Sequence, residues 1–122
     1  MSKYNVEIVL RDRDVAIEER LEAARAAREW TEFDVEDVLR DILRAIDRAQ
    51  HPDAPADRPV VLRGFSWIAE PSDGGVVIAI EIPMGAAVAG PFDIDQPRLD
   101  ALINGVLKRQ TNGVDPAAHT IH

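Results

Sequence analysis

The chain of 122 residues contains no cysteine. This absence excludes disulfide bonds, zinc sites built on thiolates and thiol nucleophiles, and it leaves the redox compartment undetermined. Serine and histidine are also scarce. Ser66 follows Gly64 as in a nucleophile elbow, but the second glycine of that motif is missing and a strand, not a helix, is predicted after it. His119 and His122 have the spacing of a chelating pair, yet no third ligand is indicated, so we expect neither a catalytic residue nor a metal site.

Long apolar stretches are missing as well. No segment has the 18 or so consecutive apolar residues that a membrane span needs. The N-terminal segment lacks the extended apolar core and the small-residue cleavage site of a signal peptide. We therefore expect a soluble, cytoplasmic protein that has no membrane contact and no cofactor.

Basic side chains are outnumbered, with 14 against 22 acidic ones and a net charge of −8. A surface that follows nucleic-acid phosphates concentrates lysine and arginine, so we expect no nucleic acid as a partner. One dense acidic run contains no base, and its members are Glu29, Glu32, Asp34, Glu36 and Asp37. It fits a solvated helix start that exploits the helix dipole, a docking patch for a basic partner, or a site for a divalent cation.

The clearest pattern lies in residues 33–50, where apolar side chains recur every three or four positions and predict an amphipathic α-helix. Asp34 is predicted to be its N-cap, with Asp37 as the carboxylate of an approximate capping box. The charged pairs on the other side contribute only about 0.2 to 0.5 kcal/mol each, so burial of the apolar stripe must supply most of the helix's stability.

Around this helix the sequence predicts an α+β domain over residues 1–110, followed by a flexible tail over 111–122. The expected order is β-α-α-β-β-α: a strand over 4–11, a helix over 15–28, the 33–50 helix, strands over 60–69 and 76–82, and a helix over 95–109. This gives two layers, in which a three-stranded, mostly antiparallel sheet is covered by helices on one face. The apolar strand over 76–82 would then lie near an exposed edge, which favours a homodimer.

Small apolar residues fill the segment 83–91, which has a glycine near each end and is predicted to be a loop. Loops are usually polar, so this one is expected to be covered. A buried connection under the last helix, a subunit or partner contact and a ligand-cradling loop all fit. Its candidate contact residues are Met84, Ala86 and Val88.

The function indicated first is that of a small acidic, non-catalytic accessory or regulatory protein that acts through protein contacts, because the standard reactive constellations are missing. Its candidate binding residues are the acidic run together with Met84, Ala86 and Val88. One alternative is a small-molecule-binding domain or small enzyme with a pocket between sheet and helices, formed by Trp67, Glu70 and Glu81. A second is an acidic mimic of nucleic acid that binds a basic protein.

Overall fold

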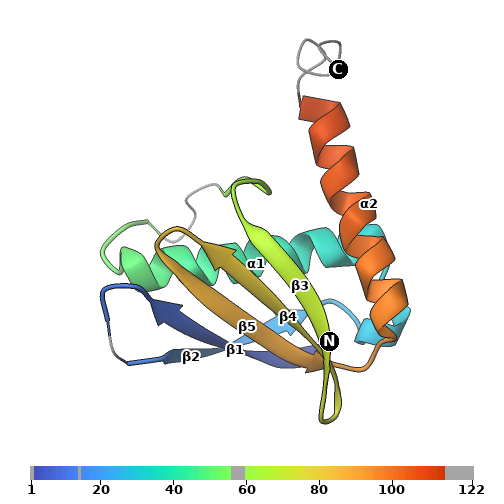
Figure 1. Ribbon diagram of the computed structural model, residues 1–122, viewed down its shortest axis with the longest axis horizontal. Coiled ribbons are helices and arrows are strands. Elements are labelled where there is room, and N and C mark those ends of the chain that lie inside the picture. Colours follow the sequence, from blue (N-terminus) through green and yellow to red (C-terminus); the bar gives the residue numbers. More distant parts are fainter. Residues whose placement is uncertain (1, 14, 56–59, 115–122) are drawn as a thin grey trace.

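The computed structural model describes residues 2–13, 15–55 and 60–114, with side chains described as far as Arg109. Along the chain the elements are β1 (Ser2–Leu10), β2 (Ile17–Ala23), a 3-10 helix η1 (Ala27–Glu29), α1 (Glu32–Gln50), β3 (Ser66–Ser72), β4 (Gly75–Ile82), β5 (Gly85–Phe92) and α2 (Gln96–Val114). Figure 1 shows the strands as one sheet, with α1 running along it and α2 steeply inclined near the start of α1.

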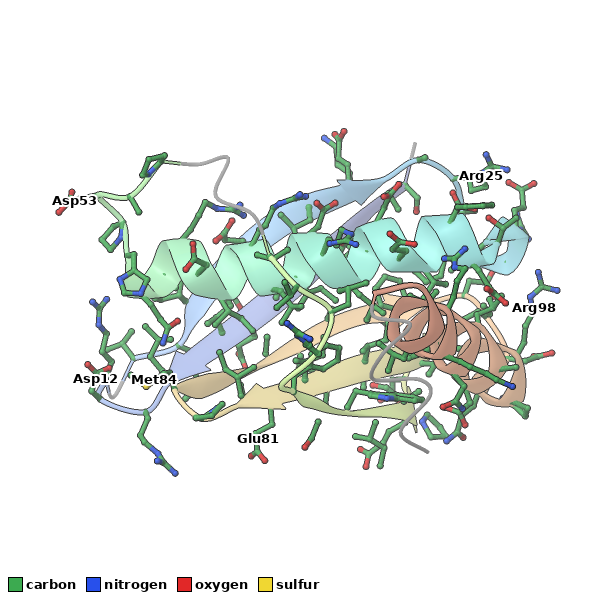
Figure 2. The ribbon with its side chains drawn as sticks, turned by 90° about the horizontal axis from the view of Figure 1, so that it is seen from above. Asp12, Arg25, Asp53, Glu81, Met84 and Arg98 are labelled. Carbon is green, nitrogen blue, oxygen red and sulfur yellow. The ribbon has the colours of Figure 1, made fainter. Side chains whose placement is uncertain are left out.

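The sheet has five strands in the order β2-β1-β5-β4-β3, and every neighbouring pair is antiparallel. The segment that contains α1 connects β2 at one edge with β3 at the other. Figure 2 shows both helices on the same side of the sheet and Glu81 pointing away from them. The described part of the chain therefore has two layers, and within it one face of the sheet carries no helix.

Alternating side chains of the strands pack against the stripe of α1. In β1 the helix side is buried from Tyr4 to Leu10, and in β4 it is buried from Val76 to Ile80. Ile42 of α1 and Ile78 of β4 are both fully buried within the same core cluster. The predicted stripe of the 33–50 helix is thus confirmed as a core element. Within the described residues, neither helix is both long and apolar enough to cross a membrane.

The α+β class is correct, but the predicted three-stranded sheet with the order β-α-α-β-β-α is wrong. The predicted helix over 15–28 is instead β2 followed by η1. Ile17 and Leu21 are four residues apart, a spacing that suits one helix face and also one strand face. Alanine, glutamate and arginine favour helix by only a few tenths of a kcal/mol each, which the seven-residue register with β1 overrides.

The predicted loop over 83–91 is also wrong, because all of it from Gly85 onward belongs to β5, the middle strand of the sheet. Its small residues suit close approach on both sides: a Cβ on Gly85 would lie 2.5 Å from the carbonyl oxygen of Val9. With β5 in place, β4 is an inner strand, so the exposed edge on which the homodimer prediction was based does not exist. The edges are β2, which is rich in charge, and β3, which contains Pro71, and both features discourage strand addition.

Two helix ends differ from the prediction. α1 begins one turn earlier, with Thr31 as N-cap, and Asp34 is the third helical residue whose carboxylate accepts hydrogen bonds from the Thr31 backbone N–H and hydroxyl. α2 continues to Val114, so the first four residues of the predicted tail are helical. The rest of that tail, residues 115–122 with His119 and His122, lies outside the described residues.

Candidate functional site

The sheet face turned away from the helices, here called the open face, carries an apolar centre. Strand alternation places every second residue of each strand on this face. Its apolar members are Val9, Ile68, Val77, Ala79, Ala86 and Val88. In the strand register Val88 lies opposite Ala79, which in turn lies opposite Ile68, so these three form a continuous row across three strands. Val9 lies opposite Ala86 in the adjacent row.

These side chains are accessible to solvent. Val9 is 46% exposed, Ile68 is 50% exposed and Val88 is 42% exposed. An inward-facing position of a strand needs apolar residues for the core, but an outward-facing one does not. Clustered exposed apolar side chains with a polar border are typical of interaction surfaces.

The open face is hollowed from its apolar centre toward the end formed by Ile82 and Gly85. A depression of about 350 Å³ lies over the row of Ile68, Ala79 and Val88. A larger one of about 740 Å³ adjoins it, between the end of β1 and the segment before β3, and Phe65 and Arg11 are among its lining residues. Both depressions include Ser66, Glu81 and Ala86, so they form one continuous concave surface.

Acidic side chains without ion-pair partners surround this apolar centre. Four glutamates lie on the open face and make no ion pair with any described residue: Glu7, Glu18, Glu70 and Glu81. Glu7 and Glu18 lie directly opposite each other in the register of β1 and β2, an arrangement that is unfavourable for like charges. Three basic residues share this side of the sheet: Lys3, which pairs with Glu22 at 3.7 Å, Arg20 on β2 and Arg11 beyond β1.

Several acids on the helix side form ion pairs within the fold. Glu19 pairs with Arg48 at 2.7 Å, and Glu36 lies between Arg40 and Arg109. Figure 2 shows that the helix layer, which carries these arginines, lies on the side of the sheet opposite Glu81. Among the glutamates of the strands, those that make no ion pair with a described residue therefore all lie on the open face.

The structure disperses the acidic run that the sequence suggested as a docking patch or metal site. Asp34 is only 8% exposed and is bound by Thr31 and by Arg25, whose Nε lies 3.3 Å from its carboxylate. The Glu36 carboxylate pairs with arginines, and the Glu32 carboxylate lies over Gly105 of α2. Glu29 and Asp37 remain exposed.

A second, more polar hollow of about 310 Å³ lies between the end of β2 and α1, with Asp34, Asp37 and Asp41 among its lining residues. Burial raises the pKa of Asp41, and the nearby Arg44 partly opposes this shift. The hydroxyl of Tyr4 is buried without a hydrogen-bond partner among the described residues, and its pKa is raised by burial and by the charge of Asp41. No group of three or more potential metal ligands occurs in the parts of the chain that the structure describes.

The predicted pocket residues do not converge between sheet and helices. Trp67 is partly buried and lies opposite Ile80 on the helix side, whereas Glu70 and Glu81 lie on the open face two cross-strand rows apart. Ser66 lies opposite Glu81, and His51 is exposed at the end of α1. Of the predicted contact residues, Ala86 and Val88 belong to the open face, and the exposed Met84 lies in the turn between β4 and β5.

Sequence reasoning missed four apolar members of the open face, namely Val9, Ile68, Val77 and Ala79. Val9 occupies a position that strand alternation assigns to solvent, between Glu7 and Arg11. An apolar residue at such a position was the feature of the sequence that could have indicated the open face.

Comparison of the chain with protein-family models, with curated proteins and with solved structures gave no match.

Proposed function

We propose that this protein is a non-catalytic accessory protein that binds another protein through the open face of its sheet. The observation that carries the proposal is the exposed apolar row of Val88, Ala79 and Ile68 at the centre of a concave, charge-bordered surface. A strand pattern that served the fold alone would place polar residues there, because the core lies on the other side.

Burial of this row by a partner would contribute a favourable free energy of binding. Full burial of a valine or isoleucine side chain contributes about 1.5 to 3 kcal/mol, and Ile68 and Val88 are each about half exposed. With Val9 and the alanines included, the centre of the face supplies several of the contacts on which interfaces depend. Affinity then depends on the partner's complementarity at the border.

Affinity capture from cells that produce the protein tests this proposal. The double substitution Ile68→Thr and Val88→Thr keeps the β-branched shape that suits strands while making the row polar. We expect the wild type to retain one or more defined partners and the double variant to lose them. Val61→Thr, at an exposed apolar position outside the sheet, is the matched control and should retain them.

Circular dichroism and urea denaturation of all three proteins establish that the substitutions leave the fold intact. If the double variant retains the same partners as the wild type and the control, the open face is not the binding surface. If the wild type captures nothing, the proposed function is wrong.

A further inference from the structure

We infer that the occupant of the open face is an amphipathic helix of a partner protein, with large apolar side chains along its centre and lysine or arginine along its borders. This inference rests on the proposed function and adds the chemistry of the partner. Three features carry it: the size of the central side chains, the unpaired charges at the border, and the way in which this chain's own helix packs on the other face.

The centre of the open face combines small side chains with larger exposed ones. Ala79 and Ala86 lie between the larger Ile68, Val88 and Val9, and the surface over them is hollowed. An apolar stripe of leucine, isoleucine or phenylalanine on a helix fills such a trough. A flat polar surface does not.

The border of the open face has an excess of negative charge, with five glutamates that include Glu22 against Lys3, Arg20 and Arg11. Glu7, Glu18, Glu70 and Glu81 make no ion pair with described residues, and Glu7 faces Glu18 directly. Lysine or arginine from a partner would supply counter-charges at these positions and relieve the repulsion between the two opposed glutamates. Anionic lipid headgroups or a second copy of this acidic chain would add like charge instead.

The covered face shows what kind of element this sheet accepts. α1 packs its apolar stripe against alternate strand residues, and at the border its Arg48 donates a hydrogen bond to Glu19 of β2 at 2.7 Å. Glu18 is the neighbouring residue of the same strand and points to the open face. A basic amphipathic helix on the open face would repeat this arrangement on the opposite side of β2.

The test uses two synthetic peptides of about 18 residues, long enough to form helix. Both carry the same leucine stripe; one has lysine and the other glutamate at the border positions. We expect the lysine peptide to shift the amide resonances of Ile68, Ala79 and Val88 in a heteronuclear NMR titration of the full chain. The glutamate peptide should cause no such shift, and binding should weaken on raising salt from about 50 to about 300 mM.

Two double variants that each remove two negative charges distinguish the effect of the border glutamates from the effect of the net charge. Glu7→Gln with Glu18→Gln should weaken binding of the lysine peptide by about fivefold or more, measured by fluorescence anisotropy. Glu29→Gln with Asp53→Asn changes two exposed acids outside the sheet and should weaken it by less than about twofold.

Four results would overturn the inference. The first three are equal binding of both peptides, equal effects of the two double variants on peptide binding, and resonance shifts confined to the helix layer. The fourth is formation of a dimer, or binding to phosphatidylserine vesicles, if either is abolished by Ile68→Thr with Val88→Thr. The capture experiment above is independent of the peptides. A failed peptide titration with partner loss in that experiment rejects the basic helix and leaves the binding face in place.

Discussion

Replacement of Asp34 by alanine tests how the fold begins its main helix. The carboxylate is nearly buried and accepts hydrogen bonds from the Thr31 backbone N–H at 2.8 Å and from the Thr31 hydroxyl at 3.0 Å. Its second oxygen lies 3.3 Å from Nε of Arg25. One side chain therefore connects the first turn of α1 with the segment that leads out of β2.

The expected loss in the free energy of unfolding follows from these three contacts. Loss of a side-chain cap at a helix N-terminus costs about 0.5 to 2 kcal/mol. Arg25 is 53% exposed, so its ion pair with Asp34 adds at most about 1 kcal/mol, and water replaces part of it. Thr31 is exposed, so its freed N–H and hydroxyl find water and leave no buried donor. We expect Asp34→Ala to lower the free energy of unfolding by about 1.5 to 2.5 kcal/mol.

Urea denaturation followed by circular dichroism measures the change, and amide hydrogen exchange locates it in the first turn of α1. Asp37→Ala is the matched control, because Asp37 is an exposed acid one turn further along the same helix. A loss below about 0.5 kcal/mol, or an equal loss in the control, would refute the structural role assigned to Asp34.

Three further predictions concern the sheet and the polar hollow. Gly85→Ala should destabilise the protein by about 1 to 3 kcal/mol in urea denaturation, since the added Cβ meets the Val9 carbonyl, whereas Ala86→Ser on the open face should change stability by less than about 0.5 kcal/mol. Tyr4→Phe should cost less than about 0.5 kcal/mol by the same assay, because the hydroxyl has no described partner, and a larger loss would reveal one. Burial raises the pKa of Asp41 above its ordinary 3.8, so the folded protein binds this proton more tightly than the unfolded chain does. The ionised Asp41 carboxylate therefore lowers the stability of the folded protein as the pH rises above 3.8. Asp41→Asn should therefore be more favourable for stability at about pH 7 than at about pH 3.5, and an unchanged or reversed difference would contradict the raised pKa.

The sequence predicted correctly those parts of the fold in which the spacing of apolar residues fits only one kind of secondary structure. The stripe of α1 can be matched only by a helix, and the Asp73-Gly74 step marks the turn between two apolar strands that do pair as β3 and β4. The positive φ of Gly74 agrees with that turn. Local pattern and tertiary packing point to the same structure at these positions.

The missed strands are those where local preference and packing disagree. β2 is built from good helix formers, and the spacing of its apolar residues fits both a helix and a strand. Pairing with β1 stabilises the strand. β5 lacks the β-branched content of a typical strand because its alanines and glycines serve close approach to β1 and β4. Without β5 in the sheet, the sequence could not show that alternate residues of the five strands form a second face that no described helix covers.

The candidate site was accessible from the sequence only in part. Ala86, Val88 and Glu81 were identified for separate reasons, and the sheet brings them to one surface. The acidic run attracted attention because its members are neighbours in the chain, yet Asp34 and Glu36 are already bound to arginines of the same protein. Sequence proximity indicated charge density, whereas the register of the strands decides which charges are left without a counter-ion.

The strand order also governs when the protein is able to fold. Asn5 pairs with Gly90 and Leu10 pairs with Gly85, so the hydrogen bonds at the middle of the sheet join the first and last strands. Closing so long a segment is entropically slow, and a growing chain on the ribosome holds β1 and the apolar β4 without their shared neighbour until β5 has been synthesised. Truncation before β5, that is before Gly85, therefore separates the sheet into two unconnected hairpins, and aggregation of such fragments is the expected result.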